Sequence, residues 1–169
     1  MDDLIANPWN ILGVLWRVVL IGGLAVVCRL TTAYRATSDL DTVNRRRDGD
    51  TAQLELLIAH GATASGVSGA LVATPVGEVQ VDVLEVTDAD LDPLPTDPND
   101  RLHVMSHAWA AATASDVVLR AAGTADMTVA VAEPGPLIAM KLQSVMNREA
   151  KKEATDLLDI VRLLSLIHI

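Results

Sequence analysis

Three aspartates inside or beside apolar, strand-like segments constrain this chain more than any other feature. Asp39 and Asp41 lie one residue apart within residues 34–43, and Asp82 lies in the alternating run 79–83. In a strand, residues i and i+2 point to the same face, roughly 7 Å apart. A carboxylate within an apolar strand is costly unless it is paired or bound to a metal. The fold is therefore expected to bring these strands together around a shared polar site.

The composition suits a single globular domain with an aliphatic core. Half of the 169 residues are hydrophobic, whereas Phe is absent and Trp and Tyr are few, so Val, Leu, Ile and Ala must fill that core. A lone cysteine, Cys28, excludes an intrachain disulfide and fits a reducing compartment, so a cytoplasmic location is expected.

The net charge of −9 is concentrated in one segment of the chain. Residues 78–100 hold eight acidic residues and no Lys or Arg, which leaves the rest of the chain near −1. A generally basic, nucleic-acid-binding surface is therefore absent. Any contact with RNA must use local basic patches or a part of the protein outside this chain.

Residues 11–28 are the one stretch that resembles a membrane span. Arg17 interrupts it, Gly22-Gly23 lies where a span needs bulky apolar residues, and the uninterrupted run 18–28 is too short to cross a bilayer. The N-terminus lacks the positive region of a signal peptide. The expectation is a buried strand, turn and helix without membrane contact, and a membrane segment is the alternative.

Hydrophobic periodicity predicts strands that alternate with helices. Asp50 or Thr51 would cap the helix that Gly61 ends, residues 103–114 fit either element, and the proline-rich acidic segment 88–100 is expected to be a loop or tether. This pattern predicts an α/β (α+β) domain, with a mixed sheet flanked by helices and a C-terminal helix. The strands are expected at 18–21, 35–43, 77–86 and 127–132, and the helices at 24–30, 51–60 and 137–164.

Two motifs near the first aspartates suit phosphate chemistry. Gly22-Gly23 precedes a predicted helix, where glycine lets backbone N–H groups approach a phosphate, although an ordinary tight turn is the simpler interpretation. In the motif R-x-T-x-D-L-D, Arg35 and Thr37 can hold a phosphate or can bond to groups nearby. Clustered carboxylates need a cation to coexist, and two Mg²⁺ ions about 4 Å apart would activate an attacking oxygen.

Basic residues near the C-terminus suggest a second half of the site. Lys141 and Arg148 lie two helical turns apart and so share a face of the predicted helix. Lys141 also has apolar neighbours, where a lysine often has a partner, whereas a solvated amphipathic helix is the alternative. His103 and His107 have i, i+4 spacing but lack further zinc ligands, so they are not expected to bind zinc.

Together these motifs resemble those of the polymerase-β-like nucleotidyltransferases, in the order GG, R-x-T-x-D-L-D and a strand aspartate. The run 136–157 is similar to the AbiEii/AbiGii-type toxin family of toxin-antitoxin and phage-defence systems, over about residues 21–163. Glu153 replaces the first Asp of the family's closing K-D-x-x-D-L-like pattern, and Leu24 stands where many nucleotidyltransferases have Ser. The resemblance implies that Asp39, Asp41 and Asp82 are metal ligands. It also implies nucleotide-binding roles for a larger set, namely Gly22, Gly23, Arg35, Thr37, Lys141, Arg148 and Asp156.

The implied reaction is transfer of a nucleoside monophosphate from an NTP to an acceptor hydroxyl with two Mg²⁺ ions. Asp39, Asp41, Asp82 and Lys141 would be the catalytic residues, and the acceptor would be a tRNA or another RNA. The implied role is the toxin of a toxin-antitoxin pair, with a cognate antitoxin as partner. Two alternatives remain open: a small-molecule nucleotidyltransferase of the antibiotic-modifying type, and a catalytically degenerate domain that binds a partner.

Residues 164–169 match the translation of a common transposase sequencing adapter. The hypothesis is a single domain over residues 1–163, truncated at its C-terminus and followed by a non-native tail. Resequencing the source with a different library chemistry checks this, because an unchanged ending would show that the tail is genuine.

Overall fold

A computed structural model of the protein describes residues 18–30, 34, 37, 39–75, 77–120, 126–147 and 150–167, except for the side chains of residues 150–153. These residues form a seven-stranded sheet in the order β3-β4-β5-β2-β1-β7-β6. The strands are β1 (Val19–Leu20), β2 (Asp39–Arg45), β3 (Thr63–Ser65), β4 (Gly69–Thr74), β5 (Gly77–Val86), β6 (Ser115–Leu119) and β7 (Met127–Val131). The helices are α3 (Gly22–Leu30), α4 (Gln53–Ala59), α5 (Asp88–Leu91), α6 (Pro98–Thr113), α7 (Pro134–Asn147) and α8 (Ala150–Ile167).

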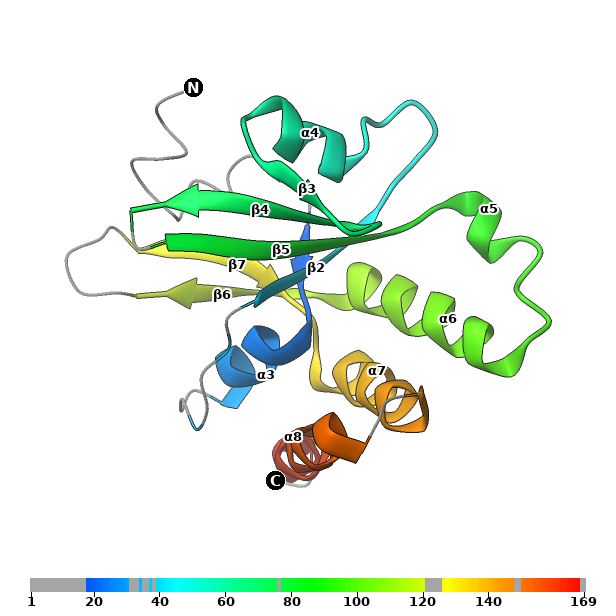
Figure 1. The fold of residues 1–169 in the computed structure, drawn as a ribbon. Helices are drawn as coiled ribbons and strands as arrows, with labels where there is room; N and C mark the ends of the chain where they lie inside the picture. Colours follow the sequence, from blue (N-terminus) through cyan, green and yellow to red (C-terminus); the bar gives the residue numbers. More distant parts are fainter. Residues whose placement is uncertain are drawn as a thin grey trace.

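The sheet is mixed, as the alternation of predicted strands and helices indicates. β2 pairs with β5 and β1 pairs with β7 in parallel, whereas the other neighbours in the sheet are antiparallel. In Figure 1, α3, α6, α7 and α8 lie on one side of the sheet and α4 lies on the other. The expected α/β (α+β) class, with flanking helices and a C-terminal helix, is confirmed.

Alternation along the central strands β2 and β5 puts the aspartates and their nearest apolar neighbours on opposite faces of the sheet. On one face Leu40 pairs with Val81, and both side chains are buried. On the opposite face Asp41 pairs with Asp82, and α3 and α6 both contact β2. Because successive residues of a strand point to opposite faces, buried apolar side chains and carboxylates coexist on the same strands.

Several predicted boundaries are confirmed. β5 spans the predicted residues, Gly77–Val86, and its valines alternate with polar residues from Val79 to Val83. The helix α4 ends before Gly61, whose φ of +100° is the conformation that glycine adopts after a helix.

The predicted cap of α4 at Asp50 or Thr51 is wrong. Ala52 holds that position, and the Asp50 carboxylate instead accepts a hydrogen bond from the Arg47 N–H.

The acidic segment 88–100 is not the loop that its prolines suggested. It contains α5 and the beginning of α6, which then extends through the ambiguous residues up to Thr113. The Asp97 carboxylate accepts hydrogen bonds from the N–H groups of Asn99 and Asp100, and Pro98 occupies the first turn. A proline without an N–H is tolerated there, so this proline begins a helix instead of ending one.

The predicted C-terminal helix is divided into α7 and α8, which pack against one another. α8 continues through Ile167. The limit of the domain at residue 163 and the adapter origin of residues 164–169 stay predictions. Among the described residues, no helix combines the length and the apolar character needed to cross a membrane.

Candidate active site

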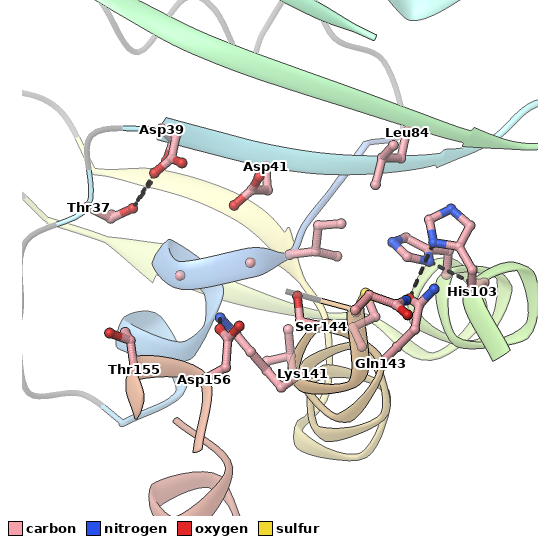
Figure 2. A pocket seen from close by; sticks show the side chains of 17 residues that line it. Thr37, Asp39, Asp41, Leu84, His103, Lys141, Gln143, Ser144, Thr155 and Asp156 are labelled. Atoms are coloured by element: carbon pink, nitrogen blue, oxygen red, sulfur yellow. Dashed lines mark hydrogen bonds and ion pairs between the residues drawn. The ribbon is translucent and has the colours of Figure 1, made fainter. Parts of the chain in front are cut away.

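The parallel pairing of β2 with β5 brings the predicted carboxylates onto one face of the sheet. Asp41 lies opposite Asp82, and Asp39 lies opposite Gln80. The Gln80 side-chain amide donates to Asp82 Oδ1 at 2.8 Å, and the Thr37 hydroxyl donates to Asp39 Oδ1 at 2.9 Å. Figure 2 shows Asp39 and Asp41 side by side on β2, above the first turn of α3. The structure therefore places Asp39, Asp41 and Asp82 on neighbouring positions of one surface.

Gly22 and Gly23 begin α3 and lie directly against Asp41. Gly22 has a φ of +65°, and a Cβ atom added to it would overlap the Asp41 carboxylate. The Ile21 N–H donates to the Asp41 carbonyl oxygen at 3.0 Å, and the Gly23 N–H donates to the Asp41 carboxylate. The diglycine thus serves two needs: a left-handed backbone at the helix start and room for a carboxylate at the helix N-terminus.

The charges of this surface repel one another. Burial raises the pKa of Asp41 above its ordinary value, and the charges of Asp39 and Asp82 raise it further, whereas Lys141 and the Gly23 N–H lower it. A divalent cation would relieve this repulsion, and hard carboxylate oxygens are the ligands that Mg²⁺ prefers. The donor chemistry therefore fits Mg²⁺. In the described part of the chain, no three His, Cys, Asp or Glu side chains are already gathered around one point.

Lys141 on α7 is bound to two buried aspartates on α8. Its Nζ atom lies 2.6 Å from Asp156 Oδ1 and 2.9 Å from Asp159 Oδ2. The two aspartate side chains are only 3% and 0% exposed, respectively. The Tyr34 hydroxyl donates to Asp159, and the Arg162 guanidinium lies 4.0 Å from the centre of the Tyr34 ring. These contacts tie α7, α8 and the chain before β2 into one network.

Asp159 was not anticipated from the sequence. The expected acidic pattern had Glu153 and Asp156 three residues apart, and the pair that holds Lys141 has the same spacing one turn later, at Asp156 and Asp159. Residues i and i+3 share a helix face, so the Asp-Leu-Leu-Asp sequence itself contained this signal. The predicted Arg35 and Arg148 lie outside the described residues.

A cavity of about 560 Å³ connects these groups with a second, unexpected set of polar side chains. Its polar lining includes Gly22, Gly23, Thr37, Asp39, Asp41, Lys141, Thr155 and Asp156, whereas Asp82 does not line it. It also includes His103 and His107 of α6 and Gln143, Ser144 and Asn147 of α7, and the apolar side chains of Ile21, Leu84, Leu137 and Met140 complete the wall. Figure 2 shows Asp39 and Asp156 toward one end and His103 and Gln143 toward the other.

Comparison with known proteins supports the fold. No protein-family profile and no curated protein matches this sequence. Among solved structures, the chain is similar to an antigenic nucleotidyltransferase-like protein from Paracoccidioides brasiliensis, with a TM-score of 0.53 and 22% identity. The match covers 88% of this chain and 67% of that one. At this identity the likeness shows that the two chains share a fold, and the expected AbiEii/AbiGii-type membership stays a prediction.

Substituting Gly22 with Ala should destabilise the protein more than the same change at Gly61. Both glycines have positive φ, which costs an alanine roughly 1–2 kcal/mol. Only at Gly22 would the new Cβ displace a carboxylate, because the space around Gly61 is open. Thermal unfolding of both variants measures the difference. Equal losses of stability at the two positions would contradict the close packing of Asp41 on Gly22.

Proposed function

We propose that this protein is a metal-dependent nucleotidyltransferase. It would transfer a nucleoside monophosphate from an NTP to an acceptor hydroxyl. One observation carries the proposal: the β2–β5 register sets Asp41 opposite Asp82, on the sheet face where α3 begins. The likeness in fold to a nucleotidyltransferase-like protein supports it.

Asp39, Asp41 and Asp82 would hold one or two Mg²⁺ ions, because their oxygens match the ion's preference and their mutual repulsion calls for a cation. The bound ions would neutralise phosphate charge and favour loss of the acceptor hydroxyl's proton. To reach an ion, Asp82 would exchange the hydrogen bond that it accepts from Gln80. Gly69 lies opposite Asp82 on β4, and its missing side chain leaves room for both Asp82 and Gln80.

The remaining residues would position the substrate. The N–H groups at the start of α3 and the Lys141 ammonium face the same end of the cavity, where the triphosphate would lie, and Thr37 lines that end. The acceptor oxygen would form a bond to the α-phosphorus as the bond to pyrophosphate breaks, and Asp82 would accept the hydroxyl proton. Asp156 and Asp159 would hold Lys141 in place, so that it does not have to be ordered when substrate arrives.

The biological role proposed is that of a cytoplasmic toxin in a toxin-antitoxin or phage-defence system. It rests on the resemblance of the run 136–157 to the AbiEii/AbiGii-type family, which implies a tRNA or another RNA as acceptor and an antitoxin as partner. Arg35 and Arg148 are proposed to bind the nucleotide on the same basis. A nucleotidyltransferase that modifies a small antibiotic-like molecule is the alternative with the same chemistry.

A domain that binds a partner without catalysing transfer is a second candidate. Two observations favour it: Lys141 is already paired with two carboxylates, and α7 and α8 expose several large apolar side chains. Exposed apolar residues along a helix are typical of a protein–protein contact. The exposed residues include Leu142, Met146, Leu157, Val161 and Leu164.

Transfer activity separates these candidates. Incubation with each labelled NTP should label a tRNA pool, and Asp41→Ala should reduce the rate by about 10²-fold or more, the scale expected when a charge-stabilising group is removed. Asp116→Asn, at an exposed position on β6 that does not line the cavity, removes a charge and should leave the rate unchanged. Labelling of an aminoglycoside instead of tRNA would favour the small-molecule enzyme. Absence of labelling in both arms would leave only the partner-binding domain.

The repulsion at Asp41 predicts an unusual effect on stability. Because the folded-state pKa of Asp41 is raised, its ionisation opposes folding above that pKa, and the penalty disappears as the pH falls below the unfolded value of about 4. Asp41→Asn should therefore raise the melting temperature at pH 7 without Mg²⁺, and the gain should shrink toward pH 4. Mg²⁺ should stabilise the wild type and the Asp116→Asn control but not Asp41→Asn. Equal stabilisation of all three by Mg²⁺ would rule out a metal site at Asp41.

A further inference from the structure

Away from the aspartates, the cavity is lined by polar side chains of α6 and α7, and among the described residues there none is acidic or basic other than histidine. They are His103 and His107 of α6 and Gln143, Ser144 and Asn147 of α7. Imidazole, amide and hydroxyl groups form directed hydrogen bonds and do not attract phosphate as a lysine or arginine would. This end therefore differs in kind from the end that holds Asp39, Asp41 and Lys141.

His107 offers an unprotonated ring nitrogen at the cavity. Its Nδ1 atom lies 2.6 Å from the His103 carbonyl oxygen, which can only accept, so Nδ1 carries the hydrogen. Burial lowers the pKa of His107 to about 4, so the ring is neutral at pH 7. Nε2 is consequently a hydrogen-bond acceptor, and within the described residues no protein group donates to it. The side chain is 5% exposed and lines the cavity, so a ligand there would supply the missing donor.

Contacts between α6 and α7 hold this end in shape. The His103 and His107 rings lie 4.1 Å apart between centroids, and His103 Nδ1 lies 3.4 Å from Gln143 Oε1. The Asn147 amide donates to the Asn99 side chain at 2.9 Å, which ties the C-terminal end of α7 to the first turn of α6. Groups whose positions are set before binding lose little entropy when a ligand arrives.

Apolar side chains complete the walls of the cavity. Leu84 of β5 and Met140 of α7 line it together with the histidines and the first turn of α3. A flat heterocycle would contact such side chains with its faces and hydrogen bond with its edge. The volume of about 560 Å³ falls within the range of roughly 300–1,000 Å³ that is typical of small-molecule sites.

We propose that the His103–His107–Gln143 end of the cavity binds the heterocyclic base of a nucleotide. This inference rests on the proposed function, because the phosphates of that nucleotide would lie against Gly22, Gly23 and Lys141. The His107 Nε2 atom accepts a hydrogen bond from an N–H of the base edge, and Leu84 and Met140 contact the faces of its ring. The base belongs either to the NTP or to the terminal nucleotide of the acceptor, and the experiment separates these two sources.

Titration calorimetry with Mg²⁺ tests the assignment, using ATP, CTP, GTP and UTP as base-bearing probes and inorganic triphosphate as the probe without a base. His107→Leu and Gln143→Ala should each weaken binding of the preferred NTP by about tenfold, the effect of one lost hydrogen bond. Neither should alter binding of triphosphate. Met105→Ala, at an exposed position of the same helix, should change neither probe. Gln143 is only partly buried, so Gln143→Ala still tests the assignment if His107→Leu, at a buried position, fails to fold.

The outcomes separate this inference from the proposed function on which it rests. If the variants bind every NTP as the wild type does, but the KM for the acceptor rises about tenfold, the base is that of the acceptor. If neither NTP binding nor the acceptor KM changes, the inference is overturned while the transferase remains. If the wild type binds free nucleosides but no triphosphate, the base site is supported and the proposed transferase activity is contradicted. Binding of neither nucleosides nor triphosphates overturns both.

Discussion

The parallel pairing of β2 with β5 is the constraint on which the rest of this structure depends. It aligns Asp41 with Asp82 on one face while Leu40 and Val81 are buried on the other. A slip of one residue would move Asp41 to the face on which Leu40 and Val81 are buried, because successive side chains point to opposite faces. The burial of Leu40 and Val81 therefore also fixes the position of the carboxylates, and Gly22 at the start of α3 lies against Asp41.

The carboxylates on the sheet repel one another, whereas the charge of Lys141 is compensated by aspartates. On the sheet, burial and two neighbouring carboxylates raise the pKa of Asp41. Below it, Lys141 is held by Asp156 and Asp159, both almost completely buried. Stability alone would not favour a partly buried carboxylate at Asp41 beside two others, and perturbed ionisable groups of this kind gather at functional sites. The proposed metal and nucleotide chemistry accounts for that cost.

Prediction from the sequence succeeded where one local rule dominated. β5 alternates from Val79 to Val83 and was predicted at its true bounds, and Gly61, with its positive φ, follows the end of α4. It failed where two rules competed. The prolines of segment 88–100 predicted a loop or tether, although Pro98, after the capping Asp97, begins α6. Asp159 was missed because spacing along one helix does not reveal which lysine, on another helix, the acid will meet.

By itself, the sequence determined the class of the fold and the side of the strands on which the aspartates stand, since both follow from local periodicity. Only the tertiary structure decided what these groups meet. The partners of Lys141, the contact of Gly22 with Asp41, and the cavity end formed by His103 and Gln143 all join segments far apart in the chain. Periodicity shows that a helix has a face to bury, but packing among all the elements selects the surface that covers it.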